Sequence, residues 1–508
     1  MLNQGVGSWP ARRLRRSPEV VAVVYEGRSW TYSEIYDRVT RLANAMAAAG
    51  VARYDRVAYL GPNHPAFLET LFATHLLGAI FVPLNFRLTA PEIEFMLADS
   101  GARLLIYGPE CEKVVAGLQS YTGISVSVAG TDSDAPQYED FLVSGTLERI
   151  DTKVLLDDSA LIMYTSGTTG RPKGAILSHG NLHWNCFNVV IDLPLGNDEV
   201  TLIGSPLFHV AALNQMFLTT FMRGGTTVIM PTWNADECFD LIEKYKVTWM
   251  FGVTRMYADL AQSPRWVTAN LSFLRSLMSG GAPIPESLIV EYQNRGLVFV
   301  QGYGMTETSP GVTMLVPEMS TVKVGSAGTP CFFVDLRIVR PDLSDVDIDE
   351  PGEVIVDGPN VTSGYWNNQV ATNAAFSNGT WLHTGDVAQR DADGYVYIID
   401  RVKDMYISGG ENVYPAEVEA VMFSHPAVAD CAVIGVPDQR WGEVGAAFVT
   451  LKEPGKVDEV QMRAFLATQM AKYKIPASYH FVDSLPRTGS GKVQKAELRR
   501  LLAARAAE

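Results

Sequence analysis

The residues best suited to chemistry gather at 164–175, which reads YTSGTTGRPKGA. Glycine lets a backbone approach a ligand closely, hydroxyl and amide groups supply hydrogen bonds, and Lys173 supplies a compact positive charge. This composition suits a polyphosphate. The segment is not a Walker A loop, because Lys173 follows Gly170 by three residues and Gly174 replaces the Ser or Thr that should come next. A surface loop without a ligand is the alternative interpretation.

Four later stretches carry residues of the same kinds in a fixed order. They are GYGMTE at 302–307, LHTGD at 382–386, RVKDMYISGGENVYPAEVE at 401–419 and PRTGSGKVQK at 486–495. The first lacks the third glycine of a dinucleotide-binding fingerprint. Together with the first stretch, these motifs resemble the adenylate-forming superfamily, which includes acyl-CoA synthetases, aryl-CoA ligases, adenylation domains and luciferases. The resemblance covers nearly the whole chain.

The resemblance implies that ATP, Mg²⁺ and coenzyme A bind this chain. Tyr303 is then expected to stack on adenine, Thr306 to contact the α-phosphate and Glu307 to hold Mg²⁺, which prefers carboxylate and phosphate oxygens. Asp386 is expected to accept hydrogen bonds from the ribose hydroxyls, with Arg401 as a ribose or phosphate contact. The other residues implied to bind ATP or coenzyme A are Thr165, Ser166, Gly167, Thr168, Thr169, Gly170, Lys173, Gly281, Ala282, Pro283, Gly302, Gly304, Gly409 and Gly410.

Two further side chains are assigned catalytic roles by the same resemblance, together with Thr306 and Glu307. Lys492, in a glycine-rich segment, is implied to bridge the reacting carboxylate and the α-phosphate, where a cation is needed as charge develops. His209 is implied to border the carboxylate end of an acyl pocket. By residue type alone, each has an ordinary alternative, a solvated lysine and a structural histidine. Lys403 is the expected pivot of a mobile C-terminal domain.

The functions expected from the resemblance share one chemistry and differ in substrate or acceptor. The leading hypothesis is an AMP-forming fatty acyl-CoA synthetase that activates a medium- or long-chain acid through an acyl-adenylate. An aryl-acid CoA ligase is the first alternative, and a stand-alone adenylation enzyme that loads a carrier protein is the second. His209 stands where amino-acid-activating relatives usually carry Asp, which argues against an amino-acid substrate. A non-catalytic binding protein on the same fold is the hypothesis from another class.

The hydrophobic pattern predicts the elements that must position these residues. Thr31 and Glu34 form a capping-box pattern before a helix that ends near Gly50. Strands are expected at 56–60, 79–83, 103–107 and 160–163, with helices at 66–77 and from 90, which is α/β alternation. The strands before 279–283 and 302–307 are expected to place both loops at the carboxyl ends of a buried sheet, where ligands of α/β proteins collect.

The chain is long enough for more than one domain, with 508 residues. We expect a large N-terminal AMP-binding domain of β-sheets with packed helices and a β region over 1–400. A hinge at 401–404 and a small mobile α+β domain over 405–508 follow. In the small domain, the pattern predicts a helix from Pro415, strands at 428–436, 446–451 and 479–482, and a helix at 457–470.

Charge and cysteine content exclude some partners. The net charge of −15 argues against nucleic acid. The five scattered cysteines favour reduced thiols in the cytoplasm, and no apolar run reaches the length of a membrane span. Arg12, Arg13, Arg15 and Arg16 form a basic cluster that is interpreted as the solvated face of a first helix ending before Pro18. Transient contact with a membrane surface is the alternative.

Overall fold

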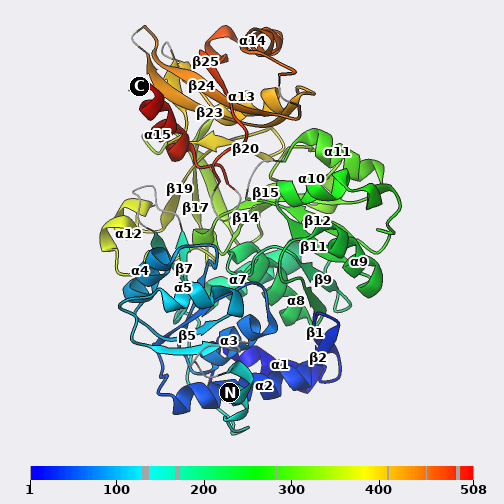
Figure 1. Ribbon diagram of the computed structural model, residues 1–508, viewed down its shortest axis with the longest axis vertical. Coiled ribbons are helices and arrows are strands. Elements are labelled where there is room, and N and C mark those ends of the chain that lie inside the picture. The colour runs from blue at the N-terminus through cyan, green and yellow to red at the C-terminus, as the bar shows by residue number, and fades with distance from the viewer. Residues whose placement is uncertain are drawn as a thin grey trace. The chain divides into compact units, whose positions relative to one another are not determined.

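The computed structural model describes residues 2–128, 137–165, 172–281, 284–408, 411–438, 440–453, 455–487 and 492–506. The chain divides into two compact units, which are described separately here (Figure 1). The first contains Met1–Leu336 and Val356–Leu382, and the second contains Arg337–Ile355 and His383–Glu508. The predicted hinge at 401–404 therefore lies inside the second unit, and its role as a pivot stays a prediction.

One sheet of the first unit has the strand order β6-β5-β3-β4-β7-β8. Its strands pair in parallel, except that β7 and β8 are antiparallel. The bounds are β3 (Arg56–Leu60), β4 (Ile80–Leu84), β5 (Ala102–Tyr107), β6 (Ile124–Ser127), β7 (Ser159–Thr165) and β8 (Lys173–Ser178). The strands expected at 56–60, 79–83, 103–107 and 160–163 are confirmed. They could be predicted because each is a run of apolar residues that the fold buries on both faces.

A second sheet of this unit has the order β15-β14-β13-β12-β11-β9-β10-β1-β2. Its central strands, from β13 to β1, are parallel, and antiparallel strands close both edges. The bounds are β1 (Val21–Tyr25), β2 (Arg28–Thr31), β9 (Val200–Ile203), β10 (Thr226–Ile229), β11 (Trp249–Gly252), β12 (Ser276–Ser279), β13 (Phe299–Gly304), β14 (Gly311–Met314) and β15 (Thr329–Pro330). The loop expected at 279–283 thus leaves the carboxyl end of β12, as predicted. The stretch expected as a loop at 302–307 begins inside a strand instead, because β13 extends to Gly304 through its pairing with β14.

Helix α3 (Pro65–Leu76) is packed on both sides. Phe67 contacts the rings of Tyr59 and Phe81 in the first sheet, and Phe72 contacts those of Phe217 and Phe221 on the other side. A helix covered all round needs apolar residues all round, which explains why its sequence shows no polar face. The capping box predicted for α2 (Tyr32–Ala48) is present, with the Thr31 hydroxyl accepting from the Glu34 amide.

The remaining helices of the first unit surround these layers. Their bounds are α1 (Trp9–Arg16), α4 (Ala90–Ser100), α5 (Glu112–Ala116), α6 (Tyr138–Val143), α7 (His179–Asp192), α8 (Thr219–Arg223), α9 (Ala235–Tyr245), α10 (Thr254–Gln262), α11 (Glu286–Asn294) and α12 (Gln369–Ala375), with a π-helix, η3, at Ala211–Leu218. Short 3₁₀ helices occupy Val6–Ser8, Pro109–Cys111, Pro264–Val267, Thr306–Thr308 and Pro317–Met319.

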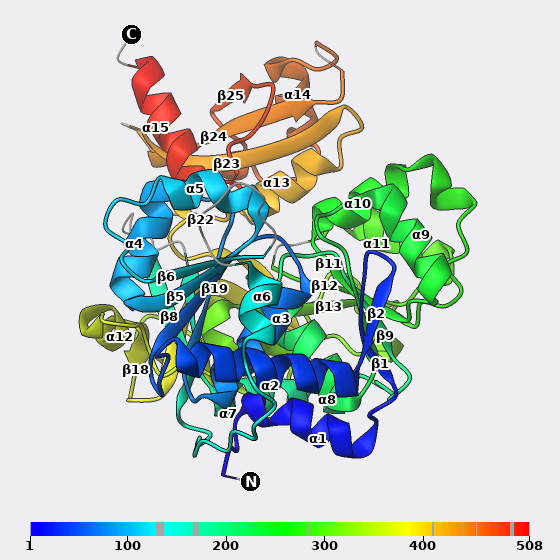
Figure 2. The same ribbon diagram turned by 60° about the horizontal axis from the view of Figure 1, so that its bottom comes forward.

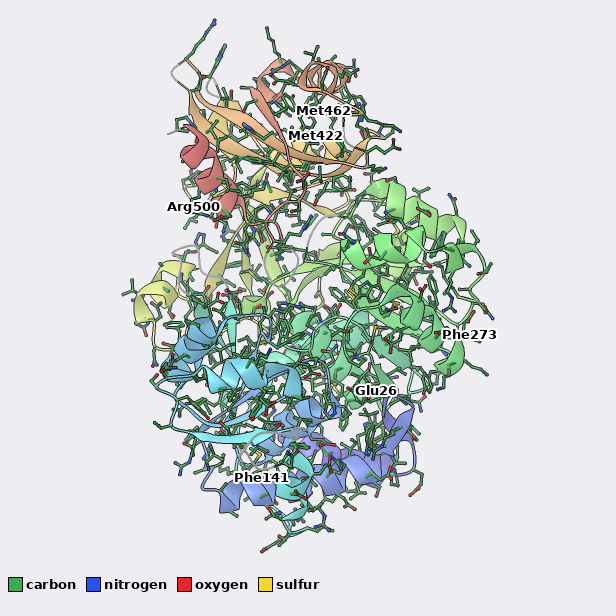
Figure 3. All side chains as sticks on the ribbon, viewed as in Figure 1. Glu26, Phe141, Phe273, Met422, Met462 and Arg500 are labelled. Atoms are coloured by element: carbon green, nitrogen blue, oxygen red, sulfur yellow. The ribbon has the colours of Figure 1, made fainter. Side chains whose placement is uncertain are left out.

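The second unit contains a sheet of order β22-β21-β24-β23, with β25 beside β24. Its elements are β21 (Tyr406–Ser408), β22 (Glu411–Val413), α13 (Pro415–Phe423), β23 (Val428–Asp438), β24 (Gly442–Leu451), α14 (Glu459–Ala467), a 3₁₀ helix at Lys472–Lys474, β25 (Ser478–Phe481) and α15 (Lys495–Ala506). Met422 and Met462 bring α13 and α14 into one fully buried core (Figure 3). This arrangement confirms the helices and strands expected after Pro415.

A further sheet has the order β16-β17-β19-β18, with β20 beside β19. Its strands are β16 (Asp335–Val339), β17 (Gly352–Asp357), β18 (Phe376–Ser377), β19 (Trp381–Arg390) and β20 (Val396–Arg401), which are the expected β region. Within the described residues, the helices are all too short or too polar to cross a membrane.

Candidate active site

The base of the predicted phosphate loop is a two-stranded turn in the first unit. β7 ends at Thr165 and β8 begins at Lys173, and these two residues face each other in antiparallel register. The Thr165 hydroxyl donates to the Lys173 carbonyl oxygen at 3.5 Å. The residues predicted to fill the loop, Ser166, Gly167, Thr168, Thr169 and Gly170, lie outside the described residues. The strand pair therefore fixes both ends of the segment that is expected to hold phosphate.

Lys173 is connected to Glu307 through a residue that the sequence did not reveal. The Lys173 ammonium lies 5.3 Å from the ring centroid of Tyr365, over its face. The Tyr365 hydroxyl in turn donates to Glu307 Oε1 at 2.9 Å. Burial, aided by the Glu307 carboxylate, raises the pKa of the Tyr365 phenol, so the phenol stays a hydrogen-bond donor at neutral pH. Tyr365 thus contacts the Lys173 cation through its ring and the Glu307 carboxylate through its hydroxyl.

Tight backbone packing holds the Gly302–Glu307 stretch in place. A Cβ on Gly304 would meet the Pro310 carbonyl oxygen at 1.7 Å, so a glycine is required there. Glu307 lies in the short helix Thr306–Thr308 and is only 5% exposed. Its backbone carbonyl accepts a hydrogen bond from the Thr362 amide. Tyr303 and Thr306 precede it and are half-buried. The predicted adenine contact thus lies in the last part of β13, and the predicted phosphate and metal contacts lie in the short helix that follows it.

The neighbouring SGGAP loop leaves the end of β12, beside this turn. A Cβ on Gly280 would lie 2.8 Å from the Gly302 carbonyl oxygen, so the two loops touch through their backbones. Gly281 has a φ of +81°, which favours glycine, and a Cβ there would meet nothing within 4 Å. Ala282 and Pro283 lie outside the described residues.

His209 stands at the start of η3, after strand β9 as expected. Its backbone carbonyl accepts from the Leu213 amide at 3.1 Å, and its ring lies 4.5 Å from that of Phe208. Further along η3, the Gln215 side-chain amide donates to the Met278 sulfur at 3.1 Å in a buried environment. The Met278 methyl also abuts Gly302, where a Cβ would lie 2.9 Å from it. η3 is therefore linked to the turn that carries Tyr303 and Glu307.

The second unit brings Asp386 and Arg401 together. They are opposite residues on β19 and β20, and Arg401 Nε lies 3.3 Å from Asp386 Oδ1. Gly385 has a φ of +71°, and its amide donates to Glu353 Oε1 at 3.2 Å. Glu353 also contacts His383 Nδ1 at 2.9 Å and was not identified from the sequence. The pair predicted to contact ribose thus forms a preassembled carboxylate and guanidinium.

Lys492 is exposed and follows a segment, 488–491, that is outside the described residues. The segment is fixed on both sides, because Arg487 pairs with Val493 and the Gln494 amide donates to the Pro486 carbonyl oxygen at 2.8 Å. Gly409 and Gly410, the predicted channel for coenzyme A, are likewise outside the described residues.

Three residues after Lys492, a half-buried ionic cluster anchors the start of α15. Lys495 Nζ lies 2.9 Å from Glu419 Oε1 on α13. Burial lowers the pKa of Lys495, but the carboxylates of Glu419 and Asp400 outweigh that effect and raise it above its ordinary value. Asp400 accepts from the amides of Arg401 and Ala416. At Lys403 burial, with the nearby charge of Arg401, lowers the pKa.

The described side chains fit a magnesium ion held with phosphate better than a metal held by protein alone. Among the described residues, no group of three or more His, Cys, Asp or Glu side chains is placed to hold a metal ion. Mg²⁺ is commonly bound through one or two carboxylates and the oxygens of a substrate phosphate. Glu307 is a buried carboxylate with Lys173 nearby, which suits that mode of binding.

Comparison with known proteins assigns the family. The AMP-binding enzyme model matches residues 10–366, and the AMP-binding enzyme C-terminal domain model matches 417–492. A feruloyl-CoA synthase from Amycolatopsis sp is 51% identical over 98% of this chain and 99% of its own. The long-chain-fatty-acid–CoA ligase FadD13 of Mycobacterium tuberculosis is 37% identical over 98% of both chains.

A solved structure shows the same architecture. The o-succinylbenzoate CoA synthetase of Bacillus subtilis, bound to its acyl-adenylate intermediate, superposes with a TM-score of 0.89. It is 34% identical, and the match covers 97% of this chain and 98% of that one. Another structure of that synthetase contains ATP and a magnesium ion. The chain belongs to the AMP-binding enzyme family, and its relatives are acyl-CoA ligases of the adenylate-forming superfamily.

Proposed function

We propose that this chain is an ATP-dependent, AMP-forming ligase that joins an aromatic carboxylic acid to coenzyme A. The single observation that carries the choice of acid is the 51% identity to feruloyl-CoA synthases over almost the full length of both chains. The leading sequence hypothesis, a fatty acid, stays a second candidate, and it is favoured by the 37% identity to FadD13.

The buried amide of Gln215 also favours an aromatic acid. Gln215 is 4% exposed, and its donor contact within the described chain is to the thioether of Met278, a weak acceptor. A buried polar group with a poor partner costs free energy, which a saturated hydrocarbon tail would leave uncorrected. A ring hydroxyl or methoxy group can accept the hydrogen bond from this amide. The linkage of Gln215 to Gly302 through Met278 places the amide beside the proposed nucleotide turn.

In the first half-reaction, the acid carboxylate attacks the α-phosphorus of ATP, so that an acyl-adenylate forms and pyrophosphate leaves. Lys173 and the segment after Thr165 hold the phosphates, and Thr306 donates to the α-phosphate. Glu307 would hold Mg²⁺, which would neutralise part of the phosphate charge. Tyr365 keeps Glu307 oriented through its 2.9 Å hydrogen bond. His209 borders the carboxylate, and Lys492 supplies the cation where two anions must approach.

The adenosine portion of ATP is held by stacking and by hydrogen bonds. Tyr303 stacks on adenine, and Gly281 leaves open space for close approach of a ligand to the backbone. Ala282, Pro283, Gly302 and Gly304 are the other residues proposed to contact the nucleotide. Asp386 accepts from the ribose hydroxyls, and Arg401, which already contacts Asp386, holds the carboxylate in position.

In the second half-reaction, the thiol sulfur of coenzyme A attacks the acyl carbonyl carbon, and the bond between that carbon and the phosphate oxygen breaks. The thioester forms, AMP leaves and the thiol proton passes to solvent. We propose that the C-terminal domain rotates about Lys403 between the halves. The rotation withdraws Lys492 and brings Gly409 and Gly410 to line the thiol channel.

Mass spectrometry of purified protein with ATP, Mg²⁺, coenzyme A and a mixed panel of aryl, fatty and amino acids tests this proposal. We expect the hydroxylated and methoxylated phenylpropenoyl-CoA thioesters to dominate. Dominant fatty acyl-CoA would move the assignment to the second candidate. Acyl-adenylate that accumulates without any thioester would instead identify an enzyme that loads a carrier protein.

A further inference from the structure

A basic pocket lies in the first unit between the ends of two helices. It has a volume of about 570 Å³, and four arginines line it, three from α1 and Arg223 from the end of α8. The α1 residues are Arg12, Arg13 and Arg16, and Trp9 adds an apolar wall. Helices α1 and α8 lie side by side, and the Arg13 Nε donates to the Phe221 carbonyl oxygen at 2.9 Å (Figure 2). None of these residues has a role in the proposed ligase reaction.

The charge of this pocket is not balanced by protein carboxylates. Within the part of the chain that the structure describes, none of the four arginines forms an ion pair with Asp or Glu. The carboxyl ends of α1 and α8 offset part of the charge, but each helix end contributes only about half a negative charge. About three positive charges therefore remain, in a chain whose net charge is −15.

The arginines are also held in place, which a merely solvated helix face does not require. A Cβ on Gly224, at a φ of +91°, would lie 2.4 Å from Arg13 Nη1, so glycine makes the space that this guanidinium occupies. Arg12 Nε donates to the Ser8 hydroxyl at 3.0 Å. Each of these two guanidiniums thus donates through Nε, and among the described residues neither makes a hydrogen bond through its Nη groups. Burial lowers the pKa of Arg13, and the charges of Arg16 and Arg223 lower it further.

We propose that this pocket binds the phosphate groups of a ligand that is separate from the substrates of the reaction. Guanidinium donors match phosphate oxygens in pairs, and several arginines together suit a diphosphate better than a single monoanion. The volume exceeds that of one phosphate and admits the adjoining part of a phosphorylated small molecule, against the Trp9 wall. The same phosphate chemistry is available from a soluble metabolite and from a phospholipid headgroup.

Arginine footprinting of the full chain tests the proposal. The protein is treated with phenylglyoxal, and the modification rate of each arginine is measured by peptide mass spectrometry. The probes are inorganic pyrophosphate, phosphatidylglycerol vesicles and, as a neutral comparison, phosphatidylcholine vesicles. Arg15 is the internal control, because it is on the same helix and does not line the pocket.

We expect saturating pyrophosphate to slow modification of Arg12, Arg13 and Arg16 by about fivefold or more, while Arg15 reacts at its original rate. Protection by pyrophosphate identifies a soluble ligand, and protection by phosphatidylglycerol vesicles alone identifies a headgroup. In an Arg12→Gln/Arg16→Gln variant, the protection of Arg13 should disappear, whereas Arg15→Gln should retain it.

The proposal would be overturned if no probe slowed modification of Arg12 and Arg16 more than modification of Arg15. Unchanged protection of Arg13 in the double variant would also overturn it. Synthesis of acyl-CoA should be the same in both variants and the wild type. The footprint is read without acid substrate, so its failure would leave the proposed ligase function untouched.

Discussion

The two units of the chain hold their proposed functional residues in different ways. In the first, Lys173 and Glu307 come from distant parts of the sequence, and each of them contacts Tyr365. In the second, Lys492 is exposed, and the described contacts nearby fix the residues on either side of its segment. Catalytic electrostatics work best with groups that need no rearrangement, which the first unit provides. A lysine that acts in one half-reaction and is then withdrawn needs a firm anchor and an exposed position.

The largest effect is expected from removing the charge of the buried carboxylate. Glu307→Gln should lower the rate of adenylate formation by roughly 10²-fold, because a bound Mg²⁺ would lose a fixed negative ligand. Tyr365→Phe is the matched control, since it keeps the ring beneath Lys173 and removes only the hydrogen bond to Glu307. We expect Tyr365→Phe to lower the rate of adenylate formation by about tenfold or less. Pyrophosphate exchange measures the rate of adenylate formation in both variants. Equal losses of rate would mean that the hydrogen bond from Tyr365 matters as much as the charge of Glu307.

The anchor in the second unit should matter for stability. Lys495→Ala leaves the half-buried Glu419 carboxylate without its cation, and we expect a loss of about 2 kcal/mol in the free energy of unfolding. Lys456→Ala breaks the exposed pair with Glu453 and should cost less than about 1 kcal/mol. Urea denaturation compares the two. Similar losses would show that the Lys495 pair is no more than a surface contact.

Substrate selectivity tests the interior of the first unit. Gln215→Leu should lower kcat/KM for a hydroxylated or methoxylated phenylpropenoic acid by about tenfold, because one hydrogen bond to the ring substituent is lost. The value for unsubstituted cinnamic acid should change much less. An equal loss of kcat/KM for both acids would mean that Gln215 contributes to core packing and does not recognise the ring substituent.

The smallest effect concerns the buried histidine His75. Burial lowers its pKa to about 4, so the unfolded chain, with a pKa near 6.5, binds the proton more readily. Stability from this group is complete above about pH 6.5 and falls as the pH drops toward 4, by about 1 kcal/mol between pH 7 and pH 5.5. His75→Gln should flatten this slope, and an unchanged slope in this variant would contradict the prediction. Thermal unfolding across this range provides the measurement.

Local sequence patterns were sufficient for the elements and for the base of the site. The runs at 56–60 and 79–83 are apolar because both sheet faces are covered, and the strand before Thr165 was found for the same reason. Tyr365 could not be found this way, because its contact with Glu307 joins residues 58 apart and arises only when the chain folds. The Glu419–Lys495 pair and the Arg223 side of the basic pocket share this cause.

The basic cluster at the N-terminus shows the limit of a one-dimensional pattern. The helix that ends before Pro18 is confirmed as α1, and Arg12, Arg15 and Arg16 are exposed as expected. The pattern did not reveal that α8 would bring Arg223 and the glycine at 224 against this helix. Residue types predicted a charged face, and only the fold turned it into a pocket.

We assign fixed groups to the first unit and a lysine that acts in only one half-reaction to the second. Measuring the two half-reactions of Lys492→Ala separately tests this assignment most directly. Pyrophosphate exchange measures the first half, and conversion of supplied feruloyl-adenylate to feruloyl-CoA measures the second, with Lys472→Ala as the control. We predict that Lys492→Ala loses the first half by 10²-fold or more and keeps most of the second, because only the first requires a cation between two anions. Equal losses in both halves would contradict this account.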